Sequence, residues 1–115
     1  TQNKVSELIK RHFKNSPDGL PGNDDTGTMS AWLIYSMIGL YPVSPADPIY
    51  AVTSPVFDKV IIELDSRYYS KSQLVIHKKG KGVIKQLKIG NTTSNHFFVS
   101  HSELVKSNNF KIILE

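Results

Sequence analysis

The chain has 115 residues, of which 39% are apolar and 21% charged, and its mean hydropathy is −0.25. These values exclude a disordered polyelectrolyte and allow one modest hydrophobic core. The absence of cysteine excludes disulfides, a thiolate zinc site and a cysteine nucleophile. No apolar run approaches the roughly 18 residues that a membrane-spanning helix needs. The chain begins at Thr1 without a signal sequence, so we expect it to be a piece of a larger protein.

The net charge of +4 lies in the second part of the chain. Residues 1–40 hold four basic and four acidic side chains, whereas residues 41–115 hold ten basic and six acidic ones. Five of the lysines lie within residues 78–88, in two alternating runs about a glycine turn, a pattern typical of the solvent face of a β-hairpin. The other interpretation is a nucleic-acid-binding patch. We expect no nucleic-acid partner, because no stacking aromatics or known binding motif accompany the lysines.

Two helices are predicted before residue 40. Apolar residues at helical spacing from Val5 to Phe13 predict an amphipathic helix of about three turns. An acidic, glycine-rich loop follows over residues 18–28. From Thr28 to Gly39 apolar residues occur on all sides, which predicts a buried helix. Only the first helix is available to cover it, so we expect this helix to belong to a bundle or barrel that continues upstream.

Strands dominate the remainder of the chain. Three prolines within residues 40–50 favour an extended, turning segment. Strands are then predicted at Tyr50–Thr53, Phe57–Leu64, Leu74–Lys78, Val83–Ile89, Phe97–Val99 and Phe110–Leu114. A capping box formed by Ser100 and Glu103 predicts a short helix over Ser100–Ser107. The predicted fold class is therefore α+β, with an N-terminal helical pair followed by a small antiparallel β unit that contains one short helix.

Two adjacent acids form the candidate catalytic group. Asp24 and Asp25 lie in the glycine-rich loop that leads into the second helix. Adjacent side chains normally point in different directions, so one would bond the loop while the other faces a cavity. The amide donors and positive dipole end of a helix stabilise an ionised carboxylate, which suits a base rather than an acid. Aspartate is also frequent at turns and helix N-caps, and spacing alone favours that structural role.

A series of motifs over residues 19–64 adds a family resemblance. The segment contains, in order, Gly-Asn-x-Asp-x-Gly at 22–27, Met-Ser-Ala-Trp at 29–32, Gly-x-Tyr-Pro-Val at 39–43 and Ser-Pro-x-Phe-Asp-Lys at 54–59. Through these blocks the chain resembles the C-terminal part of glycoside hydrolase family 92, the bacterial calcium-dependent α-mannosidases. The resemblance implies an α/α-toroid catalytic domain whose last helices are residues 1–40, followed by a C-terminal β extension over residues 41–115.

The resemblance also implies a chemistry. Family members hydrolyse α-mannosides with inversion, with a glutamic acid that protonates the leaving oxygen, an aspartate that activates water and a calcium ion that contacts the sugar hydroxyls. Asp25 fills the fixed acidic position of the motif and is the favoured base, with Asp24 the alternative and Asn23 a supporting hydrogen-bonding group. Glu7 matches no motif and is not assigned as the acid. Calcium takes six to eight oxygen ligands, which this loop alone does not supply, so the metal ligands stay unassigned.

The expected protein is thus the C-terminal fragment of a secreted or periplasmic bacterial exo-α-mannosidase acting on α-1,2-linked mannose of glycans. Its expected partners are an α-mannoside glycan and the missing upstream part of the same polypeptide. We expect the fragment alone to be inactive, because it lacks the general acid. The alternative is a carbohydrate-binding or interdomain docking β module without catalysis. We interpret Trp32 as a core residue rather than a sugar platform, and His12, His77, His96 and His101 as surface or packing residues.

Overall fold

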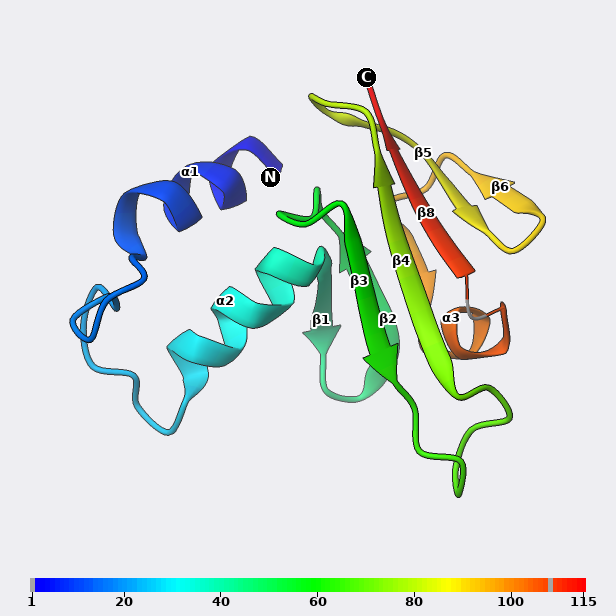
Figure 1. Cartoon of the computed structure of the whole chain (residues 1–115), viewed down its shortest axis with the longest axis horizontal. Helices are drawn as coiled ribbons and strands as arrows, with labels where there is room; N and C mark the ends of the chain where they lie inside the picture. The colour runs from blue at the N-terminus through cyan, green and yellow to red at the C-terminus, as the bar shows by residue number, and fades with distance from the viewer. Residues whose placement is uncertain (1, 108) are drawn as a thin grey trace.

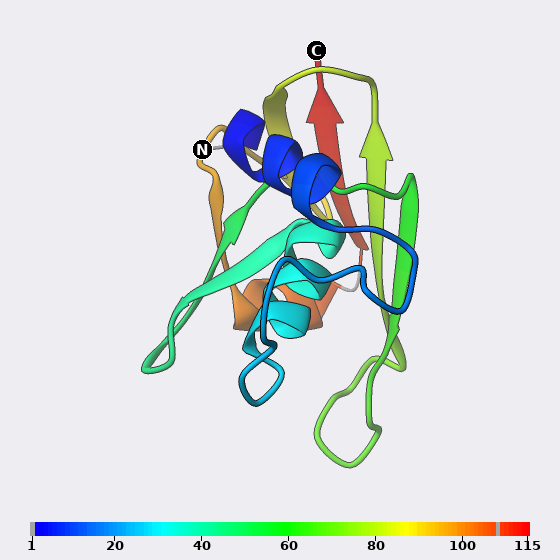
Figure 2. The same ribbon diagram turned by 90° about the vertical axis from the view of Figure 1, so that its left-hand side faces the viewer.

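The computed structural model describes residues 2–107 and 109–115. It contains three helices, α1 (Gln2–His12), α2 (Thr28–Ile38) and α3 (His101–Ser107). Its strands are β1 (Leu40–Ser44), β2 (Asp47–Val52), β3 (Lys59–Glu63), β4 (Gln73–Lys79), β5 (Ile84–Ile89), β6 (Thr92–Ser94), β7 (Phe98–Ser100) and β8 (Asn109–Leu114). The two N-terminal helices lie on one side of the strands (Figure 1 and Figure 2). This arrangement confirms the predicted α+β class. No helix among the described residues is long and apolar enough to cross a membrane.

The second helix is less buried than its composition predicts. Within the described chain only Ser36 of α2 is buried, while the Ile34 side chain is 57% exposed. The described residues thus leave much of the apolar surface of α2 exposed, and its burial in a bundle that continues upstream stays a prediction. The helix ends at Gly39, which adopts a left-handed conformation with φ of 89° and donates its N–H to the carbonyl of Tyr35.

A three-stranded antiparallel sheet follows directly from α2. Its order is β1-β2-β7, with Leu40 opposite Val52 and Tyr50 opposite Val99. The segment predicted only as extended and turning forms β1 and the first half of β2. Pro42 is accommodated because β1 is an edge strand, where a missing N–H donor is tolerated.

The second sheet has five strands in the order β3-β4-β8-β5-β6. It corrects two predictions. The sheet is mixed rather than wholly antiparallel, because β4 and β8 are parallel. The lysine-rich strands β4 and β5 do not form a hairpin, because β8 lies between them and pairs with both.

The turn between β4 and β5 shows how β8 fits between them. Gly80 and Gly82 both have positive φ, at 90° and 105°. A Cβ atom on Gly80 would lie 2.2 Å from the carbonyl oxygen of Leu114. The turn therefore passes over the end of β8, which only a residue without a side chain permits. β8 takes the central position because three of its side chains, Phe110, Ile112 and Leu114, are buried.

The hydrophobic core lies between the two sheets. Its most deeply buried side chains are Phe110, Ile76, Leu87, Leu104, Ile112 and Val99. Leu104 comes from α3, which is capped as predicted: the Ser100 N–H donates to the Glu103 carboxylate (3.2 Å) and the Glu103 N–H donates to the Ser100 hydroxyl (3.3 Å). The short helix thus closes one end of the core.

A tight junction fixes the C-terminal end of α2 to the strands. The Thr53 N–H donates to the Gly39 carbonyl (2.9 Å), and the Val56 N–H donates to the Met37 carbonyl (2.9 Å). These bonds satisfy carbonyls that have no partner within the helix. The half-buried Lys78 Nζ donates in turn to the carbonyls of Pro55 (3.1 Å) and Val56 (3.3 Å). The family motifs at 39–43 and 54–59 therefore meet at this junction.

Candidate active-site loop

The candidate loop precedes α2 at the end of the molecule that points away from the five-stranded sheet (Figure 1). Asp24 is tied to the start of the helix. Its Oδ1 accepts the backbone N–H of Ser30 (2.8 Å) and its Oδ2 accepts the Ser30 hydroxyl (2.5 Å). The Ser30 amide belongs to the first turn of α2, where backbone donors lack helical partners. Asp24 therefore has the helix-bonding role that its residue type suggested.

The surroundings of Asp24 also favour its charged form. The hydroxyl of Ser30, followed by the backbone N–H of Ser30, holds the pKa of the Asp24 carboxyl below its usual value of 3.8. Hydrogen bonds to a carboxylate stabilise the ionised form and so lower its pKa. An Asp24 carboxylate with both oxygens bonded in this way is poorly placed to accept a proton from water.

Asp25 has a different environment. Its side chain is exposed, and no side-chain hydrogen bond or ion pair among the described residues involves its carboxylate. Its carbonyl oxygen instead accepts the hydroxyls of Thr26 (2.6 Å) and Thr28 (2.9 Å). The loop thus leaves the carboxylate of Asp25 available while it holds the backbone of the same residue.

The backbone of this loop is unusual. Asp25, Thr26 and Gly27 have φ of 32°, 60° and 81° in succession. Glycine adopts such values at no cost, whereas they are rare for a β-branched residue such as threonine. Backbone conformations of this kind concentrate at functional sites, where the surrounding bonds maintain them.

The other residues predicted at the site contribute less. Asn23 is exposed, and no hydrogen bond of its side chain is found in residues 2–107 and 109–115. Glu7, the single glutamate before the loop, accepts hydrogen bonds from Lys4 (2.9 Å) and Arg11 (2.7 Å) on α1. These two cations lower the pKa of Glu7, which is the opposite of what a general acid requires. The surroundings of Glu7 therefore do not suit the role of the general acid.

The acidic side chains of the described residues do not gather into a metal-binding group. No group of three or more acidic, histidine or cysteine side chains with metal-binding geometry occurs among them. Calcium requires six to eight oxygen ligands, and both carboxylate oxygens of Asp24 are already bonded to Ser30. The oxygens of this loop therefore do not fit a complete calcium site.

Trp32 packs against the residue that follows the first helix. Its ring is stacked on that of Phe13, with 5.6 Å between the ring centroids and 19° between the planes. One face of the indole is therefore covered by a residue of this chain. This contact agrees with the interpretation of Trp32 as a packing residue.

A polar cluster that the sequence did not predict surrounds His101. The Tyr50 hydroxyl lies 3.0 Å from Nδ1 and the Tyr69 hydroxyl 3.3 Å from Nε2. Burial raises the pKa of the Tyr50 hydroxyl, which keeps it protonated. The three residues lie 51 and 32 positions apart in the sequence, so no local pattern could reveal the cluster. It borders an apolar cavity of about 230 Å³ near the other end of α2 from the acidic loop.

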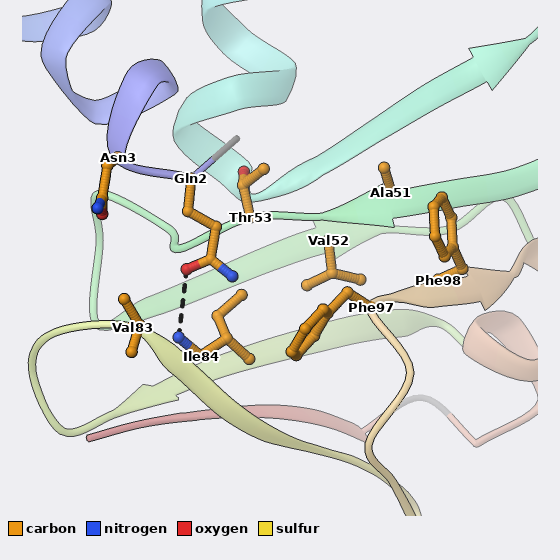
Figure 3. Close-up of a pocket in the computed structure, with 9 residues that line it drawn as sticks. All are labelled: Gln2, Asn3, Ala51, Val52, Thr53, Val83, Ile84, Phe97 and Phe98. Carbon is orange, nitrogen blue, oxygen red and sulfur yellow. Dashed lines mark hydrogen bonds between the residues drawn. The ribbon is translucent and has the colours of Figure 1, made fainter.

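A second cavity lies at the N-terminal end of α1 (Figure 3). It has a volume of about 480 Å³ and is lined mainly by residues of β2, β5 and the segment around Phe97. Gln2 reaches across it, and its Oε1 accepts the N–H of Ile84 (3.2 Å). None of the nine described residues that line this cavity has a titratable side chain. The cavity therefore offers no acid–base chemistry.

Comparison with known proteins gives a consistent set of matches. The family model for the glycosyl hydrolase family 92 catalytic domain matches residues 1–115. A curated relative, an uncharacterized secreted glycosidase of Arthroderma benhamiae, is 36% identical over 60 residues, which are 52% of this chain and 8% of that protein.

Solved structures show the same relationship. A family GH92 alpha-mannosidase from Bacteroides thetaiotaomicron is similar over 97% of this chain and 15% of its own, with a TM-score of 0.78 and 25% identity. A family GH92 inverting mannosidase from Bacteroides thetaiotaomicron VPI-5482 is similar over 99% of this chain and 16% of its own, with a TM-score of 0.80 and 23% identity. The chain thus spans about one sixth or less of the length of these proteins.

Proposed function

Because the chain belongs to glycosyl hydrolase family 92, we propose that it is the C-terminal part of a longer exo-α-mannosidase, to which it contributes the general-base loop. We refer to that longer polypeptide as the full-length enzyme. The observation that carries the proposal is the difference between the two loop acids. Asp24 is bonded to Ser30 through both oxygens, whereas the exposed carboxylate of Asp25 follows in a backbone conformation maintained by two threonine hydroxyls.

The proposed reaction inverts the anomeric centre. The Asp25 carboxylate takes a proton from water as that water attacks the anomeric carbon, on the side of the sugar opposite the leaving oxygen. A carboxylic acid protonates the leaving oxygen from the other side, and the two carboxyl groups stand roughly 6.5 to 9.5 Å apart to admit the water. Glu7 is unsuited to be that acid, since Lys4 and Arg11 stabilise its ionised form. We propose that the acid comes from the part of the full-length enzyme that precedes this chain.

Several further features are part of the proposal. We propose α-1,2-linked mannose of glycans as the substrate and a calcium requirement for the full-length enzyme, with the calcium ligands mostly outside this chain. The solved relatives named as mannosidases support the mannoside substrate. The relative named as a secreted glycosidase supports a secreted location, and a periplasmic location in a bacterium stays a prediction. The division of the chain at residue 40 into a catalytic part and a β extension also stays a prediction.

The proposal is tested by an assay of the full-length enzyme and of the 115-residue chain on α-1,2-linked mannobiose with calcium. We expect the full-length enzyme to release mannose, and proton NMR to show the β-anomer first because inversion forms it directly. We expect no release by the chain alone, because a base without its acid cannot cleave the bond. Initial release of the α-anomer, or comparable turnover by the isolated chain, would contradict the proposal.

A further inference from the structure

The loop that presents Asp25 is held at two separate points. At the first, Ser30 binds both carboxylate oxygens of Asp24 (2.8 and 2.5 Å). At the second, the carbonyl oxygen of Asp25 accepts the hydroxyls of Thr26 (2.6 Å) and Thr28 (2.9 Å). The Thr28 N–H also lies within hydrogen-bonding distance of the carbonyls of Asp24 (3.0 Å) and Asp25 (3.3 Å). The backbone of both acids is therefore fixed by residues at the start of α2.

The hydrogen bonds to the Asp25 carbonyl influence the direction of the Asp25 side chain. The direction of a Cα–Cβ bond is set by the backbone, and the φ of Asp25 is 32°. An aspartate without supporting bonds would leave this sparsely populated region. The hydroxyl of Thr28 opposes that change by binding the carbonyl of Asp25, which would rotate with it.

We propose that Thr28 is a positioning residue for the general base, whose hydroxyl holds the carbonyl of Asp25 and so sets the direction of the Asp25 carboxylate. The inference rests on the proposed role of Asp25 in the full-length enzyme. Thr28 acts through Asp25 and need not touch the sugar. Small errors in the placement of a catalytic group can lower the rate by about 100-fold, so the loss of this hydroxyl should reduce kcat with little effect on KM.

The test compares Thr28→Val with Thr28→Ser in the full-length enzyme. Valine keeps the branched shape but removes the donor, while serine keeps the donor without the methyl group. We expect Thr28→Val to lower kcat about 10- to 100-fold with KM within about twofold, and Thr28→Ser to restore most of the rate. Thr92→Val is the matched control, because Thr92 is an exposed threonine on β6, outside the candidate loop.

The remaining outcomes would each overturn the inference. An unchanged kcat in Thr28→Val would show that the hydroxyl does not position the base. A raised KM at unchanged kcat would indicate a substrate contact, and equal losses in both variants would assign the effect to the methyl group.

If Thr28→Val does not fold, Thr28→Ala removes the same donor with a higher helix propensity, and the same criteria apply. Asp25→Asn distinguishes failure of the proposed general base from failure of the positioning role. Full activity of Asp25→Asn would show that Asp25 is not the general base. An inactive Asp25→Asn enzyme together with a normal Thr28→Val enzyme would show that Thr28 does not position it.

Discussion

Asp24 and Asp25 are neighbours of the same residue type with different surroundings. Asp24 binds the first turn of α2 through Ser30, and Asp25 presents an exposed carboxylate on a left-handed backbone. The bonds to Ser30 stabilise the charged form of Asp24 and give this residue a structural role at the start of α2. This difference favours Asp25 over Asp24 as the base.

The Asp24–Ser30 contact predicts a pH-dependent contribution to stability. The folded state lowers the pKa of Asp24 below 3.8, chiefly through the Ser30 hydroxyl. The stabilisation is therefore present above about pH 4 and is lost as the pH falls through the lowered pKa, because protonation removes the charge that the hydroxyl binds. We expect Ser30→Ala to lower the unfolding temperature of the full-length enzyme at pH 7, and the difference from wild type to narrow towards pH 3.

Thermal unfolding followed by fluorescence at several pH values checks this expectation. Ser66→Ala is a suitable control, because Ser66 is exposed and its replacement should shift the unfolding temperature equally little at every pH. A difference for Ser30→Ala that is constant from pH 7 to pH 3 would show that the contact does not depend on the charge of Asp24.

At the scale of elements, α2 connects the acidic loop to the strands. It is 11 residues long, so its two ends stand about 16 Å apart at the usual rise per residue. One end carries the candidate site, and the other is fixed by the bonds from Thr53 and Val56. The position of the loop therefore depends on the junction at Gly39.

Two glycines at the ends of α2 allow this junction to be tested. Gly39 has φ of 89°, and a Cβ atom there would lie 2.7 Å from the Thr53 carbonyl oxygen and 2.8 Å from Pro55 Cγ. Gly27 has φ of 81° but no neighbour within 4 Å of a Cβ atom. We expect Gly27→Ala to cost about 1 to 2 kcal/mol of stability, the usual penalty of a left-handed residue. Gly39→Ala should cost clearly more, because the Thr53 carbonyl oxygen and the Pro55 ring block the added methyl group.

Denaturant unfolding of the two variants in the full-length enzyme measures the difference. Each carries the same chemical change at a similar φ, so the contact at Gly39 is the main variable. Equal losses of stability would mean that the junction relaxes around the new methyl group and does not fix α2.

The elements themselves were largely predictable, whereas their pairing was not. Helical spacing located α1 and α2, and the Ser100–Glu103 pattern located α3 because a capping box is a local interaction. The alternation of side chains in β4, β5 and β8 indicates strands but does not encode which strand is the neighbour. The prediction of a β4–β5 hairpin therefore failed when β8 paired with both. Prolines concealed β1, since they lower strand propensity everywhere except at an edge.

At the candidate site, too, the sequence predicted the residues but not the contacts between them. Residue types and the motif at 22–27 pointed to Asp24 and Asp25, and adjacency predicted that they would point apart. The bonds of Thr28 and Ser30 to these acids depend on three successive residues with positive φ. Positive φ is rare for the β-branched Thr26, and no local propensity encodes a run of three such residues, so the sequence did not predict this conformation.

In the whole molecule, we propose that this chain forms one part of a larger active site. α2 leaves Ile34 57% exposed and Tyr35 40% exposed, which fits the expectation that a larger helical bundle covers this helix. We propose that the loop supplies a base, and we expect the acid and most calcium ligands from the remaining polypeptide. The similar solved structures, of which this chain covers 15% and 16%, have the length for such a remainder.

We propose that Asp25, and not Asp24, is the general base of the full-length enzyme. The most direct test is to compare kcat for Asp25→Asn and Asp24→Asn on α-1,2-linked mannobiose, with circular dichroism as the control for folding. We expect Asp25→Asn to lower kcat by at least about 100-fold, in the range typical of general-base loss. Asp24→Asn should keep a clearly higher rate, since its amide oxygen can still accept a bond from Ser30. A folded Asp25→Asn enzyme with near wild-type kcat, or a larger loss in Asp24→Asn, would contradict the account.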